Sequence, residues 1–171
     1  FAVFELGMNN TGEIAFLSNL IRPKVALITN VHGVHLEQLK TERAIAEAKA
    51  EIFNGLSENG SVVLNQDSPW IDFLKSRAEK KGIKNIITFG EDKKSDLQLL
   101  EWQPGEGKSF VKIQLKNETH QYVLSETGKH RALNSVGVLA VVHALGLNIQ
   151  HAAQCFKNIS TPFGRLSLIH I

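Results

Sequence analysis

The spacing of apolar residues over the first 90 positions predicts strands that alternate with helices. Short apolar runs bounded by turn residues predict buried strands, at residues 1–6, 24–29, 61–65 and 84–89. Apolar residues at helical spacing, with capping residues at the ends, predict helices at residues 12–21, 42–54 and 69–81. This alternation favours a parallel sheet with helices on both faces, an α/β fold.

The pattern changes after residue 95, where three segments alternate or pair across short turns. They predict a small antiparallel β unit at about 95–125, made of residues 97–102, 109–115 and 119–124 with turns at Pro104-Gly105 and Lys116-Asn117. Two further helices are expected at residues 130–145 and 149–157.

Lys49 is the unusual residue of the helix predicted at 42–54. It lies four residues after Ile45 and three before Ile52, on the apolar stripe of that helix. A lysine held against a core loses solvation, so its pKa falls and a neutral amine becomes accessible. The alternative is a lysine whose stem covers the core while its ammonium stays in water. Periodicity alone favours that second interpretation.

Composition sets the class of the protein. The chain has 171 residues, 43% hydrophobic and 21% charged, typical of one soluble domain. Its net charge of +2 gives no reason to expect a nucleic-acid or membrane partner. No apolar run approaches the roughly 20 residues of a membrane span, and no signal peptide is apparent. A single cysteine, Cys155, fits a reducing compartment, so we expect a cytoplasmic location.

Both ends of the chain read as interrupted. It begins inside a predicted strand without an initiator Met, and it stops at residue 171 without a cap. We therefore expect a domain at residues 1–165 that is truncated on its N-terminal side. Residues 166–171 fit equally a strand cut short, as at the start of a further domain, or a non-native tail.

Three chemically distinctive residues follow the first two predicted strands. Glu5 directly follows an apolar run, His35 lies in the next loop and Lys49 lies on the helix after it. Ligands of open parallel sheets bind beyond the carboxyl ends of the strands, where these residues would lie. Each also has an ordinary explanation, since strand-end acids often cap helices and loop histidines are commonly solvated. His32 and His35 are three apart, which is only a weak metal signal.

Five other polar residues are candidate ligand contacts, each with a structural alternative. Asn65 and Asp67 end the third predicted strand and also suit a turn. His130 and Asn134 lie four apart on one helical face, where capping is the alternative. A lone arginine such as Arg165 is weak evidence for a phosphate contact. The chain has no GxxxxGK[ST] phosphate loop.

Taken together, these segments resemble the Mur ligases, the ATP-dependent amide-forming enzymes of peptidoglycan synthesis. The similarity is carried in order by Glu5-Leu6-Gly7-Met8-Asn9 with Gly12-Glu13-Ile14, Thr29-Asn30-Val31 with His35-Leu36-Glu37, Ala48-Lys49-Ala50-Glu51-Ile52-Phe53, Gly128-Lys129-His130 with Asn134, and Gly164-Arg165. Within the family, the chain most resembles the type that adds D-alanyl-D-alanine to UDP-N-acetylmuramoyl-tripeptide through an acyl phosphate. The resemblance implies a P-loop-like central domain, with ATP and Mg²⁺ as cofactors.

The resemblance also implies roles for the candidate residues. Glu5, His35 and a carbamylated Lys49 would ligate Mg²⁺, which prefers oxygen ligands, and would be the catalytic set. The later segment, with His130 and Asn134, would contact the nucleotide, Asn134 at the adenine. Arg165 would contact the phosphates or the ribose. Asn65 and Asp67 would lie near the nucleotide.

Two positions depart from the family pattern. Arg131 stands where many relatives have Asn, and Phe163 where many have Pro. The resemblance further implies that the phosphate loop and the uridine domain lie upstream and the closing domain downstream. The full-length protein would then be a monomeric cytoplasmic enzyme, and this fragment alone would be inactive.

Alternatives remain open. The ligase that adds the third peptide residue and folylpolyglutamate synthase belong to the same class of enzyme. A non-catalytic nucleotide-binding α/β module belongs to a different class.

Overall fold

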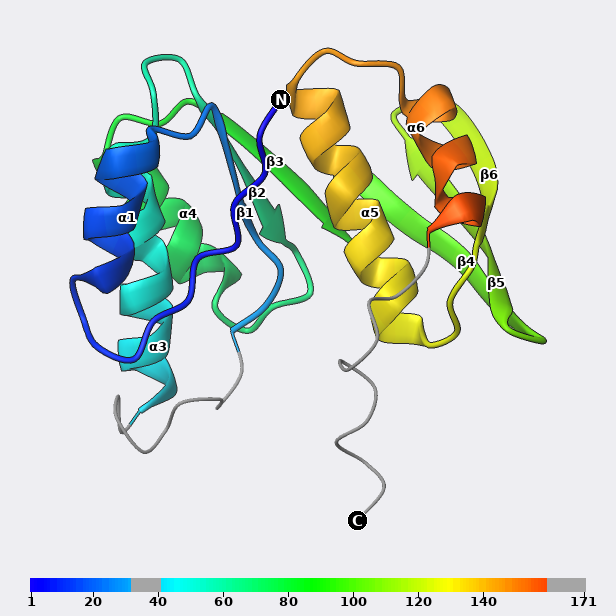
Figure 1. Ribbon diagram of the computed structural model, residues 1–171, viewed down its shortest axis with the longest axis horizontal. Coiled ribbons are helices and arrows are strands. Elements are labelled where there is room, and N and C mark those ends of the chain that lie inside the picture. The colour runs from blue at the N-terminus through cyan, green and yellow to red at the C-terminus, as the bar shows by residue number, and fades with distance from the viewer. Residues whose placement is uncertain (32–40, 160–171) are drawn as a thin grey trace.

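The computed structural model describes residues 1–31 and 41–159. In this part of the chain six strands form one sheet, in sequential order from β1 to β6 (Figure 1). The strands are β1 (Val25–Ile28), β2 (Ser61–Asn65), β3 (Asn85–Gly90), β4 (Leu97–Gly105), β5 (Lys108–Leu115) and β6 (Glu118–Leu124). The helices are α1 (Glu13–Ile21), α3 (Glu42–Ala50), α4 (Ile71–Lys80), α5 (Lys129–Ala144) and α6 (Ile149–Cys155), with 3₁₀ turns η1 (Glu51–Gly55) and η2 (Phe156–Asn158).

Strands β1 to β3 form the parallel part of the sheet, as predicted. Every residue of β2 is buried, because helices cover both faces of this part. Val62 and Leu64 pack into a core cluster with α3 and α4, whereas Val63, between them, packs into a second cluster with α5. The continuous apolar run of β2 follows from this burial on both faces.

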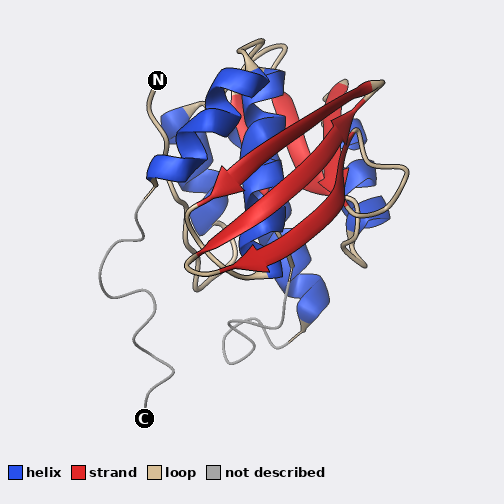
Figure 2. Cartoon of the chain, turned by 90° about the vertical axis from the view of Figure 1, so that its right-hand side faces the viewer, coloured by secondary structure: helices blue, strands red, loops and turns tan. Residues whose placement is uncertain are grey.

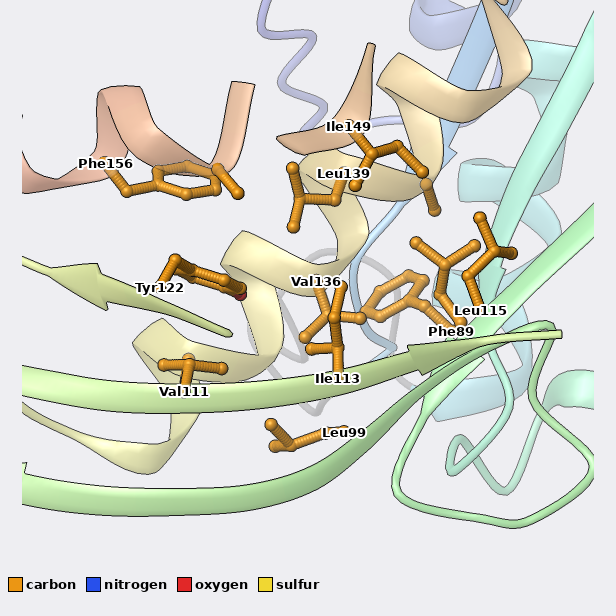
Figure 3. Packing of buried hydrophobic residues seen from close by; sticks show 14 of the residues in the cluster. Phe89, Leu99, Val111, Ile113, Leu115, Tyr122, Val136, Leu139, Ile149 and Phe156 are labelled. Carbon is orange, nitrogen blue, oxygen red and sulfur yellow. The ribbon is translucent and has the colours of Figure 1, made fainter. Parts of the chain in front are cut away.

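Strands β4 to β6 are antiparallel, also as predicted. One face packs against α5 and α6, and its side chains form a core with Phe89 of β3 (Figure 3). The opposite face has no helix over it among the described residues (Figure 2). Phe110 lies on that open face and is 46% exposed. None of the described helices is both long and apolar enough to cross a lipid bilayer.

The antiparallel strands form the small unit predicted at about 95–125, and they belong to the same sheet as the parallel strands. They continue the parallel sheet, because β3 and β4 pair in parallel at Phe89–Leu97 and Gly90–Gln98. The carboxylate of Asp96 strengthens this junction by accepting hydrogen bonds from the backbone N–H and the hydroxyl of Thr88, both at 2.8 Å. The predicted turn at Pro104-Gly105 is wrong, since both residues pair within β4 and the chain reverses at residues 106–107.

Residues 1–6 do not form the predicted strand. Phe1 and Val3 are almost fully exposed, and Phe4 is 61% exposed. A strand requires a neighbouring chain for its backbone hydrogen bonds, and β1 pairs only with β2 in the described part of the sheet. An apolar run without such a partner remains irregular.

The predicted helices are present, with different ends. The segment at 42–54 divides into α3 and the 3₁₀ turn η1, and Thr41 caps α3 by accepting a hydrogen bond from the N–H of Ala44 at 3.1 Å. Helix α4 begins at Ile71, two residues later than predicted, because Ser68 and the following residues form a turn. Helix α5 lies within one residue of its predicted limits.

Candidate functional site

Asn65 joins the carboxyl ends of β1 and β2. Its side chain is 7% exposed. The amide nitrogen donates to the carbonyl of Thr29 at 3.1 Å, and the amide oxygen accepts from the N–H of Asp67 at 2.9 Å. A buried carboxamide needs such partners, and here the backbone supplies them. Asn65 therefore shapes the strand ends, and its predicted contact with a nucleotide stays a prediction.

Asp67 makes the corresponding connection between β2 and β3. Its two carboxylate oxygens accept hydrogen bonds from the N–H groups of Glu91 at 2.7 Å and Asp92 at 2.9 Å. The chain passes so close at Gly90 that a Cβ there would lie 2.7 Å from the Asp67 carboxylate. The carboxyl ends of three parallel strands thus form one connected edge, at which the nucleotide role of Asp67 stays a prediction.

The start of α5 is attached to this edge by an ion pair. The Lys129 ammonium lies 2.9 Å from the Glu91 carboxylate, and Glu91 directly follows β3. His130 and Asn134 are exposed and lie four residues apart, on one face of α5. The structure therefore places two of the predicted nucleotide contacts, an imidazole and a carboxamide, on the helix whose first turn is held beside the strand ends.

Gly128 and Arg131 complete the entry into α5. Gly128 has a φ of +114°, and a Cβ there would lie 2.9 Å from the His130 ring. Glycine is therefore needed at this turn. Arg131, which departs from the family pattern, places one guanidinium nitrogen 3.0 Å from both carboxylate oxygens of Glu126. That ion pair explains Arg131 as a structural residue.

Lys49 lies in the last turn of α3, and its side chain is partly buried. Its helix packs on the core through Ile45 and Ala48, both fully buried. This burial lowers the pKa of the Lys49 amine, because water no longer fully solvates the ammonium. No acid or other hydrogen-bond partner faces the amine within the described parts of the chain. The structure thus agrees with the interpretation that Lys49 is desolvated.

Glu5 is exposed and lies in the irregular segment that precedes α1. Its neighbour Leu6 packs, and Met8 is buried, against the same core cluster as Ile45 of α3. The segment that carries Glu5 and the helix that carries Lys49 therefore share one core.

Two predicted site residues, His35 and Arg165, lie outside the described residues, as do residues 166–171. The convergence of Glu5, His35 and Lys49 on one ion consequently stays a prediction. No group of three or more His, Cys, Asp or Glu side chains gathers in residues 1–31 and 41–159.

Glu51 makes a long-range contact that the sequence analysis did not anticipate. Its carboxylate accepts hydrogen bonds from the N–H groups of Gly12, at 2.8 and 2.9 Å, and Ala15, at 3.2 Å. Gly12 and Glu51 are 39 residues apart. The residues at the start of α1 provide no side-chain cap of their own, and nothing in that segment indicates that a distant residue provides one. The only indication in the sequence is that Glu51 follows Lys49 by two residues.

Comparison with known proteins decides the family. The sequence profile described as "Mur ligase middle domain" matches residues 1–142. The chain belongs to the Mur ligase family. Over its whole length this Mur ligase domain is 31% identical to the UDP-N-acetylmuramoyl-tripeptide–D-alanyl-D-alanine ligase of Rickettsia prowazekii, and it spans 38% of that relative.

Solved structures give the same fold. The crystal structure of MurF from Acinetobacter baumannii matches 94% of the chain with a TM-score of 0.87 at 24% identity, over 34% of its own length. MurF from Thermotoga maritima, solved in complex with ADP, matches 92% of the chain with a TM-score of 0.77 at 26% identity, over 35% of its length. The six-stranded sheet with its helices is thus the fold of a Mur ligase middle domain.

Proposed function

We propose that this chain is the ATP-binding middle domain of a ligase that adds D-alanyl-D-alanine to UDP-N-acetylmuramoyl-tripeptide in peptidoglycan synthesis. The observation that carries the proposal is the similarity along the entire chain to a ligase named for this reaction. In this reaction ATP phosphorylates the peptide carboxylate, and the amine of the dipeptide then displaces phosphate from the acyl phosphate.

The edge formed by the carboxyl ends of β1 to β3 is the proposed nucleotide site. The complex of the Thermotoga maritima relative with ADP supports it. Asn134 offers both a donor and an acceptor, as adenine recognition requires. His130 lies one turn before it, and the first N–H groups of α5 lack a side-chain cap. Such groups favour a negatively charged ligand. Arg165 supplies a fixed positive charge for the phosphates.

The proposed metal ligands are Glu5, His35 and Lys49, and the donor chemistry of Lys49 fits Mg²⁺ after one modification. The partly buried amine loses its proton more readily than a surface lysine. As a neutral amine it attacks the carbon of CO₂, forming an N–C bond and releasing a proton to water. The resulting carbamate is an anion with two oxygens, the donor type that Mg²⁺ prefers. Glu5, His35 and the modified Lys49 would hold the cation, which when bound would supply positive charge for the transferring phosphoryl group.

The test uses the complete gene product that contains this chain. With ATP, Mg²⁺, UDP-N-acetylmuramoyl-tripeptide and D-alanyl-D-alanine, we expect phosphate release and a product with the mass of the joined peptide. L-Alanine with UDP-N-acetylmuramate, the third-residue amino acid with UDP-N-acetylmuramoyl-dipeptide, and glutamate with folate serve as competing substrate pairs.

Each result decides between the alternatives. If only a competing substrate pair is turned over, the protein would be assigned to a different ligase of the same family. ATP binding without turnover of any pair would favour a non-catalytic nucleotide-binding module. A further check is the intact mass of the protein in bicarbonate, where we expect a gain of about 44 Da, as CO₂ addition requires. The gain is expected to be absent in Lys49→Ala.

A further inference from the structure

The start of α1 is fastened to the end of α3 by contacts that leave little freedom between the two segments. The Glu51 carboxylate, at the junction of α3 and η1, binds the N–H groups of Gly12 and Ala15. Farther along α1, the hydroxyl of Ser18 donates to the carbonyl of Ile52 at 2.6 Å. The backbones approach so closely at Gly55 that a Cβ there would lie 2.1 Å from Ser18.

The loop before α1 is fastened as well. Glu13 accepts hydrogen bonds from the N–H of Asn9 at 2.7 Å and from the side chain of Asn10 at 2.9 Å, which folds the loop back onto the first turn of α1. Met8 is 7% exposed and packs in the core cluster that α3 helps to form. The chain from Met8 to α1 therefore has anchors at both ends.

These contacts connect two of the proposed metal ligands. Glu5 precedes the anchored Met8 by three residues, and Lys49 precedes Glu51 by two. We propose that Glu51 is a positioning residue that fixes the Glu5 segment relative to Lys49 by capping α1. This inference rests on the proposed function, since it assigns Glu51 a part in assembling that site.

The chemistry of the cap requires a carboxylate. Both oxygens of Glu51 accept from the single N–H of Gly12, and one of them also accepts from Ala15. In Glu51→Gln an NH₂ donor replaces one oxygen and faces an N–H donor, so part of the cap is lost. Glu51→Asp keeps both oxygens and the charge but is shorter by one CH₂. We expect it to fall between the wild type and Glu51→Gln.

Two control variants separate a specific effect of Glu51 on the proposed metal site from the general effect of losing a helix cap. Glu47→Gln makes the same chemical change one turn earlier on α3, where the ion pairs of Glu47 within the described residues are with the exposed side chains of Arg43 and Arg77. Asn148→Ala removes the cap of α6, a helix on the other side of the sheet. The Asn148 side chain there accepts a hydrogen bond from the N–H of His151 at 2.8 Å. We expect Glu51→Gln and Asn148→Ala to lower the melting temperature similarly, by about 3 °C.

The experiment measures Mn²⁺ binding, as an oxygen-preferring probe for the Mg²⁺ site, by paramagnetic resonance on the complete gene product. A second measurement follows Lys49 carbamate by ¹³C NMR in labelled bicarbonate. We expect Glu51→Gln to weaken Mn²⁺ binding about 10-fold, the size seen when support of metal ligands is lost. Carbamate occupancy should fall with it, while both controls match the wild type. Faster amide exchange at Gly12 and Ala15 in Glu51→Gln verifies that the cap has opened.

The outcomes are distinguishable. Equal Mn²⁺ affinity in wild type, Glu51→Gln and Asn148→Ala would overturn the positioning role and leave the proposed ligase function intact. Equal weakening of Mn²⁺ binding in Glu51→Gln and Asn148→Ala would show that lower stability in general weakens binding, and would also overturn the positioning role. A wild type that turns over substrate but neither binds Mn²⁺ nor carries a carbamate would remove the proposed ligand set, and the positioning role with it.

Discussion

The parallel and antiparallel parts of the sheet differ in how their side chains are buried. In β2, the central parallel strand, Val62, Val63 and Leu64 are all fully buried. In β5 burial alternates, so Val111 is 2% exposed and its neighbour Phe110 is 46% exposed. The difference follows from coverage, since helices lie on both faces of β1 to β3 but on one face of β4 to β6.

The candidate site residues are also distributed unevenly between the parallel and antiparallel parts. Among the described candidate site residues, Asn65 and Asp67 lie at the end of β2, Lys49, His130 and Asn134 lie on helices that flank the parallel part, and Glu5 lies in the irregular segment before α1. Parallel strands have carboxyl ends at one edge, and in this protein the Asn65 amide, which donates and accepts, and the Asp67 carboxylate, which accepts, connect three such ends by hydrogen bonds. The antiparallel part contributes the core on which α5 rests, and so indirectly the position of His130 and Asn134.

The largest expected effect comes from the residue at which both parts meet. Phe89, in β3, is fully buried and packs closely on Gly137 of α5, where a Cβ would lie 3.0 Å from the ring. We expect Phe89→Ala to lower the free energy of unfolding by about 3–5 kcal/mol. Urea unfolding followed by circular dichroism measures it. A loss below about 1 kcal/mol would mean that the two parts do not share a core.

A substitution at Lys49 is expected to separate activity from stability. Lys49→Met keeps an apolar stem and removes the ammonium, so turnover of the complete enzyme should fall about 100-fold or more with no loss of melting temperature. Burial lowers the pKa of Lys49 in the folded protein. Wild-type stability should therefore rise as pH increases from that lowered pKa towards about 10.4, the value of an unfolded chain.

That rise is expected to be absent in Lys49→Met. In Lys49→Ala, acetate should restore part of the activity by occupying the vacated space with a carboxylate, whereas bicarbonate should not. Full turnover in either variant would remove Lys49 from the mechanism.

A smaller effect is expected at the polar contact inside the antiparallel core. The Tyr122 hydroxyl lies 2.7 Å from the Ser135 hydroxyl, which itself donates to the carbonyl of Ala132 at 2.7 Å. Tyr122→Phe should cost about 1 kcal/mol in unfolding free energy. Burial raises the pKa of Tyr122, so the unfolded chain ionises first. Stability should then decline above about pH 10, and more steeply in wild type than in the variant. Parallel pH curves would contradict this.

The smallest effect is expected on the open face. Phe110→Ser removes a half-exposed ring that lies against the Lys108 ammonium, 5.4 Å from the ring centre. We expect a change in unfolding free energy within about 0.5 kcal/mol. A cost close to that of Phe89→Ala would show that this face is packed in solution, and would remove the contrast between the two parts.

The sequence predicted those elements whose determinants are local. Residues 61–65 form a strand because an apolar run ends at a turn, and Thr41 caps the following helix from within its own segment. It also identified Lys49, because a charge on an apolar stripe is visible without knowledge of the neighbours. Lys49 is partly buried, as its place on the apolar stripe predicts, but its role in a site stays a prediction. The family match confirms the resemblance.

Long-range pairing is what the sequence could not show. Residues 1–6 have the composition of a strand, but a strand depends on a neighbouring chain that no local pattern reports. The junction of β3 with β4 consists of two residue pairs, too few to leave a periodic signal. The cap that Glu51 provides for α1 spans 39 positions and depends on the fold as a whole.

That short junction between β3 and β4 has a practical consequence. Two residue pairs, the Thr88–Asp96 contacts and a hydrogen bond from the Gln98 side chain to the carbonyl of Glu91 link the parallel and antiparallel strands directly, whereas α5 packs on β1, β2, β3, β4 and β5. A cleavage in residues 91–95 would therefore cut the backbone without removing what holds the domain together. Two separately expressed pieces divided there, the second carrying α5, should reassemble into one folded domain, which makes the domain a candidate scaffold for split reporters.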